Sequence, residues 1–263
     1  MYGFEIERPT SVADAVAALG ADEAQALGGG QTLIPTLKQR LAMPSKLVAL
    51  SGIAELRYVR REGDVLKIGG GTTHGTVARE AAGNFPGLAA LAAKIGDPAV
   101  RNRGTIGGSL ANNDPSACYP AAALACGATI VTNSREIAAD DYFQGMFTTA
   151  LEEGEIVTEV RFPIPEKAAY TKFEQPASRF ALVGVFVAKY ADGVRVAVTG
   201  ASNDGVFRWS AAEEALSGSF SADAVAGLAA PDGSDMISDL HGSGAYRAHL
   251  VGVMTKRAVV AAG

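Results

Sequence analysis

The chain has 263 residues, of which 48% are hydrophobic and 19% charged, and its formal net charge is −5 at pH 7. This length predicts one large domain or two moderate ones, and the apolar content excludes a disordered chain. Without a basic block, the acidic balance disfavours a nucleic-acid or anionic-membrane partner. No apolar stretch reaches the roughly 18 residues that span a bilayer, and the charged beginning shows no secretory signal, so we expect a soluble, cytoplasmic protein.

In the first half, local patterns predict alternating strands and helices with glycine at the junctions. Ser11 is a candidate N-cap and Gly20 a candidate end for the first helix. The expected elements are a helix over 11–20, a strand over 46–50, a hairpin of 58–61 with 65–68, helices over 85–95 and 119–127, and a strand over 128–132.

The second half has a different pattern. A strand over 156–162 is closed by Pro163 and Pro165, and this stretch is the candidate boundary between domains 1–165 and 166–263. Two apolar runs around Asp192-Gly193 predict a hairpin of 183–190 with 194–199. Helices are expected over 213–216, 222–228 and 246–260, with a surface loop over 229–238. In the last helix, we expect one side to carry Tyr246, Leu250, Val253 and Arg257.

Three glycine clusters stand out, at 28–30, 69–71 and 107–108. Their flanks are not copies of one another, so we interpret them as three separate loops rather than a repeat. Common nucleotide and hydrolase motifs are absent: His74 stands where G-x-G-x-x-G needs its last glycine, and the chain has no Gly-Lys pair, no G-x-S-x-G and no H-E-x-x-H.

Two of these loops share a chemical pattern. The first is Gly28, Gly29, Gly30, Gln31 and Thr32, and the second is Thr105, Ile106, Gly107, Gly108 and Ser109. Glycine lets successive backbone N–H groups converge on a ligand, and the hydroxyls and the amide add donors. Together they could hold a pyrophosphate without a lysine, with Leu33, Ile34 and Pro35 as apolar walls. Equally, both could be tight turns at strand–helix junctions, and the residues alone leave both readings open.

The loops also carry a family resemblance. Residues 28–35, GGGQTLIP, look like the A-G-G-H/Q-S-L-[IL]-P loop of the FAD-binding medium subunits of molybdenum hydroxylases, the group that includes carbon monoxide dehydrogenase and xanthine dehydrogenase. Residues 95–111 resemble that family's second FAD loop almost throughout. The stretches 2–10, 69–74 and 246–250 are also similar, so the resemblance covers nearly the whole chain.

The resemblance implies a fold and a function. The fold would be α+β: an α/β-like, two-lobed FAD-binding region over 1–165, then a small C-terminal α+β domain with an antiparallel sheet over 166–263. The function would be that of an oxidoreductase subunit without catalytic or metal-binding residues of its own, passing electrons from [2Fe–2S] clusters through FAD to an external acceptor. The implied partners are a molybdopterin-binding large subunit and a small subunit with two [2Fe–2S] clusters, in a dimer of heterotrimers. Cys118 and Cys126 are the only cysteines, too few to hold those clusters.

The resemblance also implies site residues. The two loops would hold the phosphates and the ribityl chain of FAD, with Leu33 beside the first. Val100 and Ile156 would pack against the flavin or the adenine, and Lys172 would lie near the flavin. Cys118 stands where many members carry an aspartate that bonds the cofactor, so that contact is either lost or supplied by Asp114.

Other residues and other functions compete with this reading. His74 could lie near the cofactor or simply pack in its loop, and Cys126 is expected to be buried. Arg101 and Arg103 could steer phosphate, face a partner or be solvated. A self-sufficient flavoenzyme and a protein that has lost cofactor binding are the alternative functions.

Overall fold

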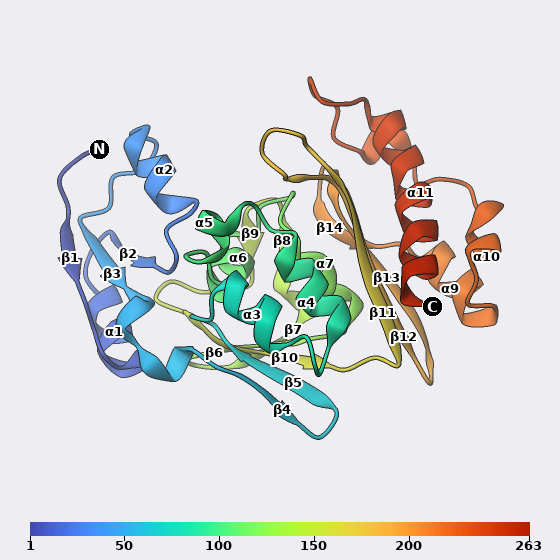
Figure 1. Ribbon diagram of the computed structural model, residues 1–263. Helices are drawn as coiled ribbons and strands as arrows, with labels where there is room; N and C mark the ends of the chain where they lie inside the picture. Colours follow the sequence, from blue (N-terminus) through green and yellow to red (C-terminus); the bar gives the residue numbers. More distant parts are fainter.

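The computed structural model describes all 263 residues. Its three larger sheets lie in a row with helices between and around them (Figure 1), and β8 (Phe143–Gly145) and β9 (Thr148–Thr149) form a fourth, two-stranded sheet. The N-terminal lobe holds a small parallel sheet of order β1-β3-β2. Its strands are β1 (Glu5–Glu7), β2 (Ala24–Leu27) and β3 (Lys46–Ala49), and its helices are α1 (Val12–Leu19) and α2 (Leu33–Lys38). As predicted, Ser11 caps α1, its side chain accepting from the backbone N–H of Asp14, and Gly20 ends it.

The second sheet is antiparallel throughout, in the order β4-β5-β10-β6-β7. Its strands are β4 (Val59–Glu62), β5 (Val65–Gly69), β6 (Thr129–Thr132), β7 (Glu136–Ala138) and β10 (Val157–Pro163). The expected α/β-like character of the first region therefore holds only for the N-terminal lobe. The reason is that β4–β5 and β6–β7 are tight hairpins, which can only pair antiparallel, and β10 returns between them.

A layer of short helices lies between this sheet and the C-terminal one (Figure 1). It consists of α3 (His74–Glu80), α4 (Pro86–Ala93), α5 (Pro98–Arg101), α6 (Ile106–Asn112) and α7 (Tyr119–Ala125). Helix α6 contacts β10, while α4 and α7 contact the C-terminal sheet. The connection to β10 adds α8 (Ala139–Tyr142), β8 (Phe143–Gly145) and β9 (Thr148–Thr149).

The C-terminal sheet is a four-stranded antiparallel meander, β11-β12-β13-β14. Its strands are β11 (Lys167–Glu174), β12 (Ala181–Tyr190), β13 (Gly193–Ser202) and β14 (Gly205–Arg208), and its helices are α9 (Ser210–Gly218), α10 (Ala222–Ala226) and α11 (Gly244–Ala262). Strands β12 and β13 form the predicted hairpin. Helix α11 covers the face of the sheet turned away from the middle helices (Figure 1).

Helix α11 carries Tyr246, Leu250, Val253 and Arg257 along one side, as the spacing predicts, and this side is only partly buried. Tyr246 and Arg257 are exposed, whereas Val251, Met254 and Ala258 lie in the core. A charged residue also faces the core: Arg247 is buried, and its two terminal nitrogens donate to the carbonyls of Leu182 and Gly200 and to Asp239. These bonds offset most of the cost of burying the cation, although its Nε has no partner in the chain.

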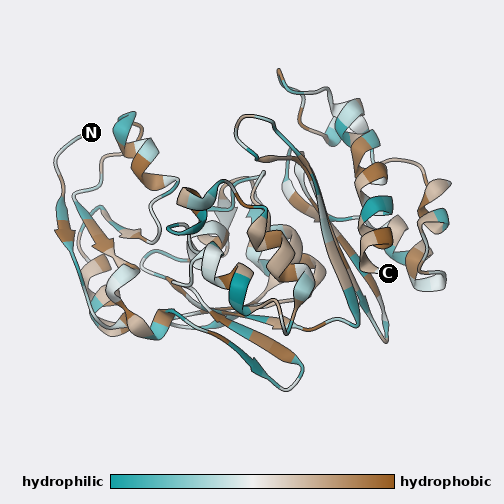
Figure 2. Cartoon of the chain, in the orientation of Figure 1, coloured by the Kyte–Doolittle hydropathy of each residue, from teal (hydrophilic) through white to brown (hydrophobic).

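The main hydrophobic core joins the two halves of the chain. Side chains of α4 and α7 pack in it together with Tyr170 and Phe186 of the C-terminal sheet. Figure 2 shows the apolar residues of this helical layer in brown. A second core lies between the C-terminal sheet and α11, and a small third one fills the N-terminal lobe. None of the helices combines the length and the apolar content needed to cross a membrane.

Candidate functional site

The two glycine loops lie directly against each other. A β-carbon at position 29 would overlap the carbonyl oxygen of Arg103 and lie 2.5 Å from the Cα of Gly104. One at position 28 would lie 3.0 Å from Oγ1 of Thr105. Only glycine permits so close an approach of two backbones. The glycines of the first loop therefore bring together two segments about 75 positions apart.

The first loop, between β2 and α2, offers a row of unused donors. The backbone N–H groups of residues 28–33 donate to no other group of the chain. Gly30 has φ +71°, a conformation that favours glycine, and it turns the backbone so that neighbouring amides can converge. Thr32 adds an exposed side chain, while the Gln31 amide donates to the carbonyl of Gly29. Consecutive free amides of this kind suit a phosphate or another anion.

In the second loop four of the five backbone amides, those of residues 106–109, are already used, contrary to the expectation that they hold the ligand. Ile106 and Gly107 donate to the carbonyls of Thr72 and Gly70, at 3.1 and 2.9 Å. Gly108 donates to Oγ1 of Thr105, the N-cap of α6, and Ser109 to the carbonyl of Thr105. What this loop can offer a ligand is the backbone N–H of Thr105, the Thr105 O–H, which its accepting role leaves free, and the Ser109 hydroxyl.

The third glycine cluster, residues 69–71, packs against the second loop. A β-carbon at position 107 would lie 2.6 Å from the carbonyl oxygen of Gly70, so α6 rests on this segment. Sequence reasoning assigned the cluster no role in the site. The similarity of residues 69–74 to the family's sequence could have pointed to a role for this cluster. Residue types alone, however, do not show which backbone groups form hydrogen bonds with one another.

His74 lies behind the second loop and is 5% exposed. Its backbone N–H donates to the carbonyl of Gly104, and a β-carbon at position 104 would lie 2.5 Å from its Nε2. Burial, with a smaller contribution from the charge of Arg101, lowers its pKa to about 4, so the ring is neutral at pH 7. The imidazole stacks at an angle on Tyr119, with ring centroids 5.3 Å apart. Gly104 is thus in contact with both His74 and Gly29.

The two apolar residues expected beside the cofactor lie in different places. Val100 is half-buried and packs against Gly96 within the second loop segment. Ile156 is 3% exposed and lies in the core of the N-terminal lobe with Ile53 and Leu56. The side chain of Ile156 is thus part of this core, and its packing against the flavin or the adenine stays a prediction. Leu33 begins α2 and is half-buried.

Cys118 and Lys172 lie together, at 3.7 Å between Sγ and Nζ. Cys118 is buried, which raises the pKa of its thiol. Asp114 closes a local turn, one carboxylate oxygen accepting from the N–H of Ser116 at 2.8 Å, and burial raises its pKa. The ammonium of Lys172 also bonds two backbone carbonyls, so it is held by this chain.

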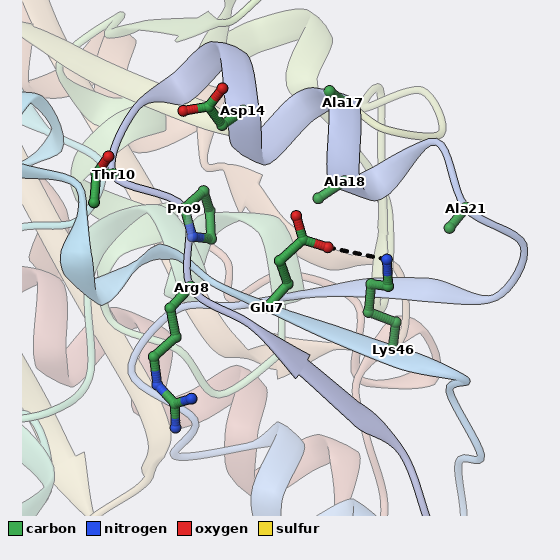
Figure 3. Close-up of a pocket in the computed structure, with 9 residues that line it drawn as sticks. All are labelled: Glu7, Arg8, Pro9, Thr10, Asp14, Ala17, Ala18, Ala21 and Lys46. Carbon is green, nitrogen blue, oxygen red and sulfur yellow. Dashed lines mark hydrogen bonds and ion pairs between the residues drawn. The ribbon is translucent and has the colours of Figure 1, made fainter.

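Two hollows lie away from the glycine loops. One, of about 560 Å³, is on the N-terminal lobe between β1 and α1, and the ion pair of Glu7 with Lys46 at 2.9 Å lies along it (Figure 3). The other, of about 520 Å³, lies on the C-terminal sheet beside Arg195 and Arg208. Neither is lined by any residue of the predicted site, so the site rests on the contact between the two loops.

The sequence and the structure both match known flavoproteins. Residues 2–165 match the family described as the FAD binding domain in molybdopterin dehydrogenase. The carbon monoxide dehydrogenase medium chain of Hydrogenophaga pseudoflava is 35% identical, the match covering 98% of this chain and 96% of that one. The nicotine 6-hydroxylase medium subunit of Paenarthrobacter nicotinovorans is 36% identical, with 97% and 95% covered. In the structure of reconstituted CO dehydrogenase from Oligotropha carboxidovorans, a chain 33% identical superposes with a TM-score of 0.89, covering 99% of this chain and 98% of that one.

These matches show that the chain is an FAD-binding component of an oxidoreductase, with an α+β fold. The chain belongs to the FAD-binding medium subunits of the molybdenum hydroxylase family.

The residues present fit the cofactor. A diphosphate needs several convergent donors, and the first loop supplies free amides beside the hydroxyl of Thr105.

Proposed function

We propose that the diphosphate of FAD is held chiefly by the free backbone amides of residues 28–33. The hydroxyls of Thr32, Thr105 and Ser109 add donors, and Gly29 keeps the two loops in contact. The observation that carries this proposal is the run of unpartnered N–H groups pressed against the second loop. Because the donors are neutral dipoles fixed before binding, little reorganisation is needed when the anion arrives.

The remaining predicted site residues take supporting roles in this proposal. Ile106, Gly107 and Gly108 fix the second loop through their own hydrogen bonds, and Leu33 and Val100 supply apolar surface beside it. Asp114, Cys118 and Lys172 lie at and before α7 and on β11, and they shape the side of the site next to the C-terminal sheet.

We further propose that this subunit works between a molybdopterin-binding large subunit and a small subunit with two [2Fe–2S] clusters, in a dimer of heterotrimers. FAD, when bound, supplies the chemistry that carries electrons from those clusters to an external acceptor. Several relatives are named medium chains of dehydrogenases or the medium subunit of a hydroxylase, which supports a multi-subunit assembly. The two cysteines of this chain are buried and free, so any cluster must come from a partner.

The domain division that we propose is 1–165 for FAD binding and 166–263 for the C-terminal domain. The end of the family match at residue 165 supports it, as does the start of the C-terminal meander at Lys167. The shared core makes these two domains one packed body.

The test starts with the full chain, purified and incubated with FAD. We expect a bound flavin spectrum, capture of the two partner subunits when the three are co-expressed, and flavin reduction only in the assembled complex with substrate. A chain that binds FAD and turns over a substrate alone would support the self-sufficient flavoenzyme instead. A chain without flavin absorbance after reconstitution would overturn the proposal.

A further inference from the structure

The ammonium of Lys172 connects the C-terminal sheet to the middle helices. The hydroxyl of the preceding residue, Thr171, donates to the carbonyl of Met254 on α11, so Thr171 faces that helix. Side chains alternate along a strand, so Lys172 faces the opposite way, toward the middle helices. There its Nζ donates to the carbonyls of Lys94 and Arg179, at 2.6 and 2.7 Å, and lies 3.7 Å from Sγ of Cys118.

An ammonium has three N–H donors, and this one has three acceptors. They come from three different segments. Lys94 follows α4 and leads into the second glycine loop, Arg179 belongs to the turn between β11 and β12, and Cys118 immediately precedes α7. We call this set of contacts the Lys172 clasp.

The turn that the clasp holds is strained. Arg179 has φ +60°, a backbone conformation that non-glycine residues seldom adopt. Its guanidinium also reaches the carbonyl of Gly96, at 3.4 Å. A residue in such a conformation stays there only where its surroundings fix it. Within the turn, the N–H of Arg179 donates to the carbonyl of Gln175 at 2.8 Å, and that of Gln175 to the carbonyl of Phe180 at 2.9 Å. The contacts to Lys172 and Gly96 are the ones that fix this turn to the rest of the chain.

On the other side, the clasp leads to the site. From Lys94 the chain continues through Gly96 and α5 to Arg103 and Gly104, the backbone against which Gly29 packs. Arg101 makes this segment compact, because its guanidinium bonds back to the carbonyls of Ile95 and Gly96. A shift of Lys94 would therefore be passed on to Arg103 and Gly104, the backbone that the first loop contacts.

We propose that Lys172 is a positioning residue for FAD: it fixes the β11–β12 turn to the entry of the second glycine loop and so holds the two loops in register. It does this without touching the cofactor. The inference rests on the proposed role of the loops in FAD binding.

The test compares Lys172→Met with Lys189→Met in the full chain. Lys189 lies on the neighbouring strand β12, its ammonium 5.6 Å from the ring centroid of Phe220, away from the loops. Trypsin cleavage after Arg179, followed by peptide mass mapping, reports whether the turn is held. The dissociation constant of FAD, from quenching of flavin fluorescence, reports on the site, and thermal unfolding of the FAD-free chain reports on overall stability.

In Lys172→Met we expect cleavage after Arg179 to become about tenfold faster and FAD binding about tenfold weaker, as for the loss of one charged hydrogen bond. Lys189→Met should match the unaltered chain in both. Lys172→Arg keeps the charge and some donors, so its cleavage rate and FAD affinity should lie between those of Lys172→Met and those of the unaltered chain. If Lys172→Met does not fold, Lys172→Arg takes its place in the comparison. Unchanged cleavage in a folded variant, or faster cleavage with unchanged FAD affinity, would overturn the proposal. Failure of the unaltered chain to bind FAD would instead refute the proposed function, while the cleavage comparison still tests the clasp.

Discussion

At the scale of single residues, Gly29 has the least freedom in the site. Its α-carbon lies where any side chain would overlap the backbone of Arg103. Gly29→Ala should therefore separate the loops and weaken FAD binding by at least about 100-fold, with a stability cost of about 1–3 kcal/mol from overpacking. The ratio of flavin to protein absorbance after reconstitution measures the first effect, and chemical unfolding the second.

The matched control is Gly83→Ala, because a β-carbon there would meet nothing within 4 Å and its φ is not in the left-handed region. It should leave both quantities unchanged. Normal FAD binding by Gly29→Ala would mean that the loops need not touch.

The burial of His74 predicts that the free energy of unfolding depends on pH. Its pKa is about 4 in the fold and 6.5 as the ordinary value, so the unfolded chain binds the proton more readily. The contribution of the neutral ring to stability is complete above pH 6.5 and is lost as the pH falls from 6.5 to 4, by about 3 kcal/mol. Urea unfolding at pH 7 and pH 4 should show a smaller drop in His74→Gln than in the unaltered chain. His249→Gln, exposed on α11, should show the full drop; an equal drop in all three would contradict the burial of His74.

Among the elements, helix α6 begins within the second loop, and Thr105 of that loop is its N-cap. Thr105 Oγ1 accepts from the N–H of Gly108 at 3.2 Å, and Ser221 caps α10 in the same way through Ala224 at 3.3 Å. Thr105→Ala and Ser221→Ala should each cost about 1 kcal/mol in the free energy of unfolding. Only Thr105→Ala should also weaken FAD binding, because its hydroxyl faces the first loop. Equal FAD affinities in the two variants would show that the Thr105 hydroxyl has no part in the site.

The elements that sequence reasoning predicted are those with local signals. Ser11 and Gly20 delimit α1, Pro120 lies in the first turn of α7, and the Asp192-Gly193 turn joins β12 to β13. The burial of Arg247 was not predicted, because its partners Leu182 and Gly200 lie about 50 to 65 positions away. The hairpin of β4 with β5 was predicted, but the rest of the middle sheet was not, because β10 inserts between strands that precede it by many residues.

The site was predicted in the same uneven way. Residue types and spacing pointed to two loops that meet, and the contacts of Gly28 and Gly29 confirm that they do. The expectation that both loops offer their amides was wrong for residues 106–109 of the second loop, because Gly70, Thr72 and Thr105 take those hydrogen bonds. The sequence could not show this, because Gly70 and Thr72 lie more than 30 positions upstream.

At the scale of the whole molecule, the shared core predicts cooperative unfolding. Phe186, on β12, packs between Phe85 of the helical region and Tyr170, with ring centroids 6.2 and 6.4 Å apart. Phe186→Ala should destabilise the chain by about 3–5 kcal/mol while keeping a single transition, monitored by far-ultraviolet circular dichroism and by flavin release. Phe147→Ala, at a 60% exposed position, should change little. Two separate transitions would show that the C-terminal domain unfolds by itself.

Amide hydrogen exchange with FAD and with riboflavin reports whether the amides of residues 28–33 hold the diphosphate. Residues 28–33 have no internal acceptors, whereas the amides of Ile106 and Gly107 are already bonded. FAD should slow exchange in peptides covering residues 28–33, with little change at 106–107, and riboflavin, which lacks the diphosphate, should leave residues 28–33 unprotected. Bound FAD with unchanged exchange at residues 28–33 would contradict the account.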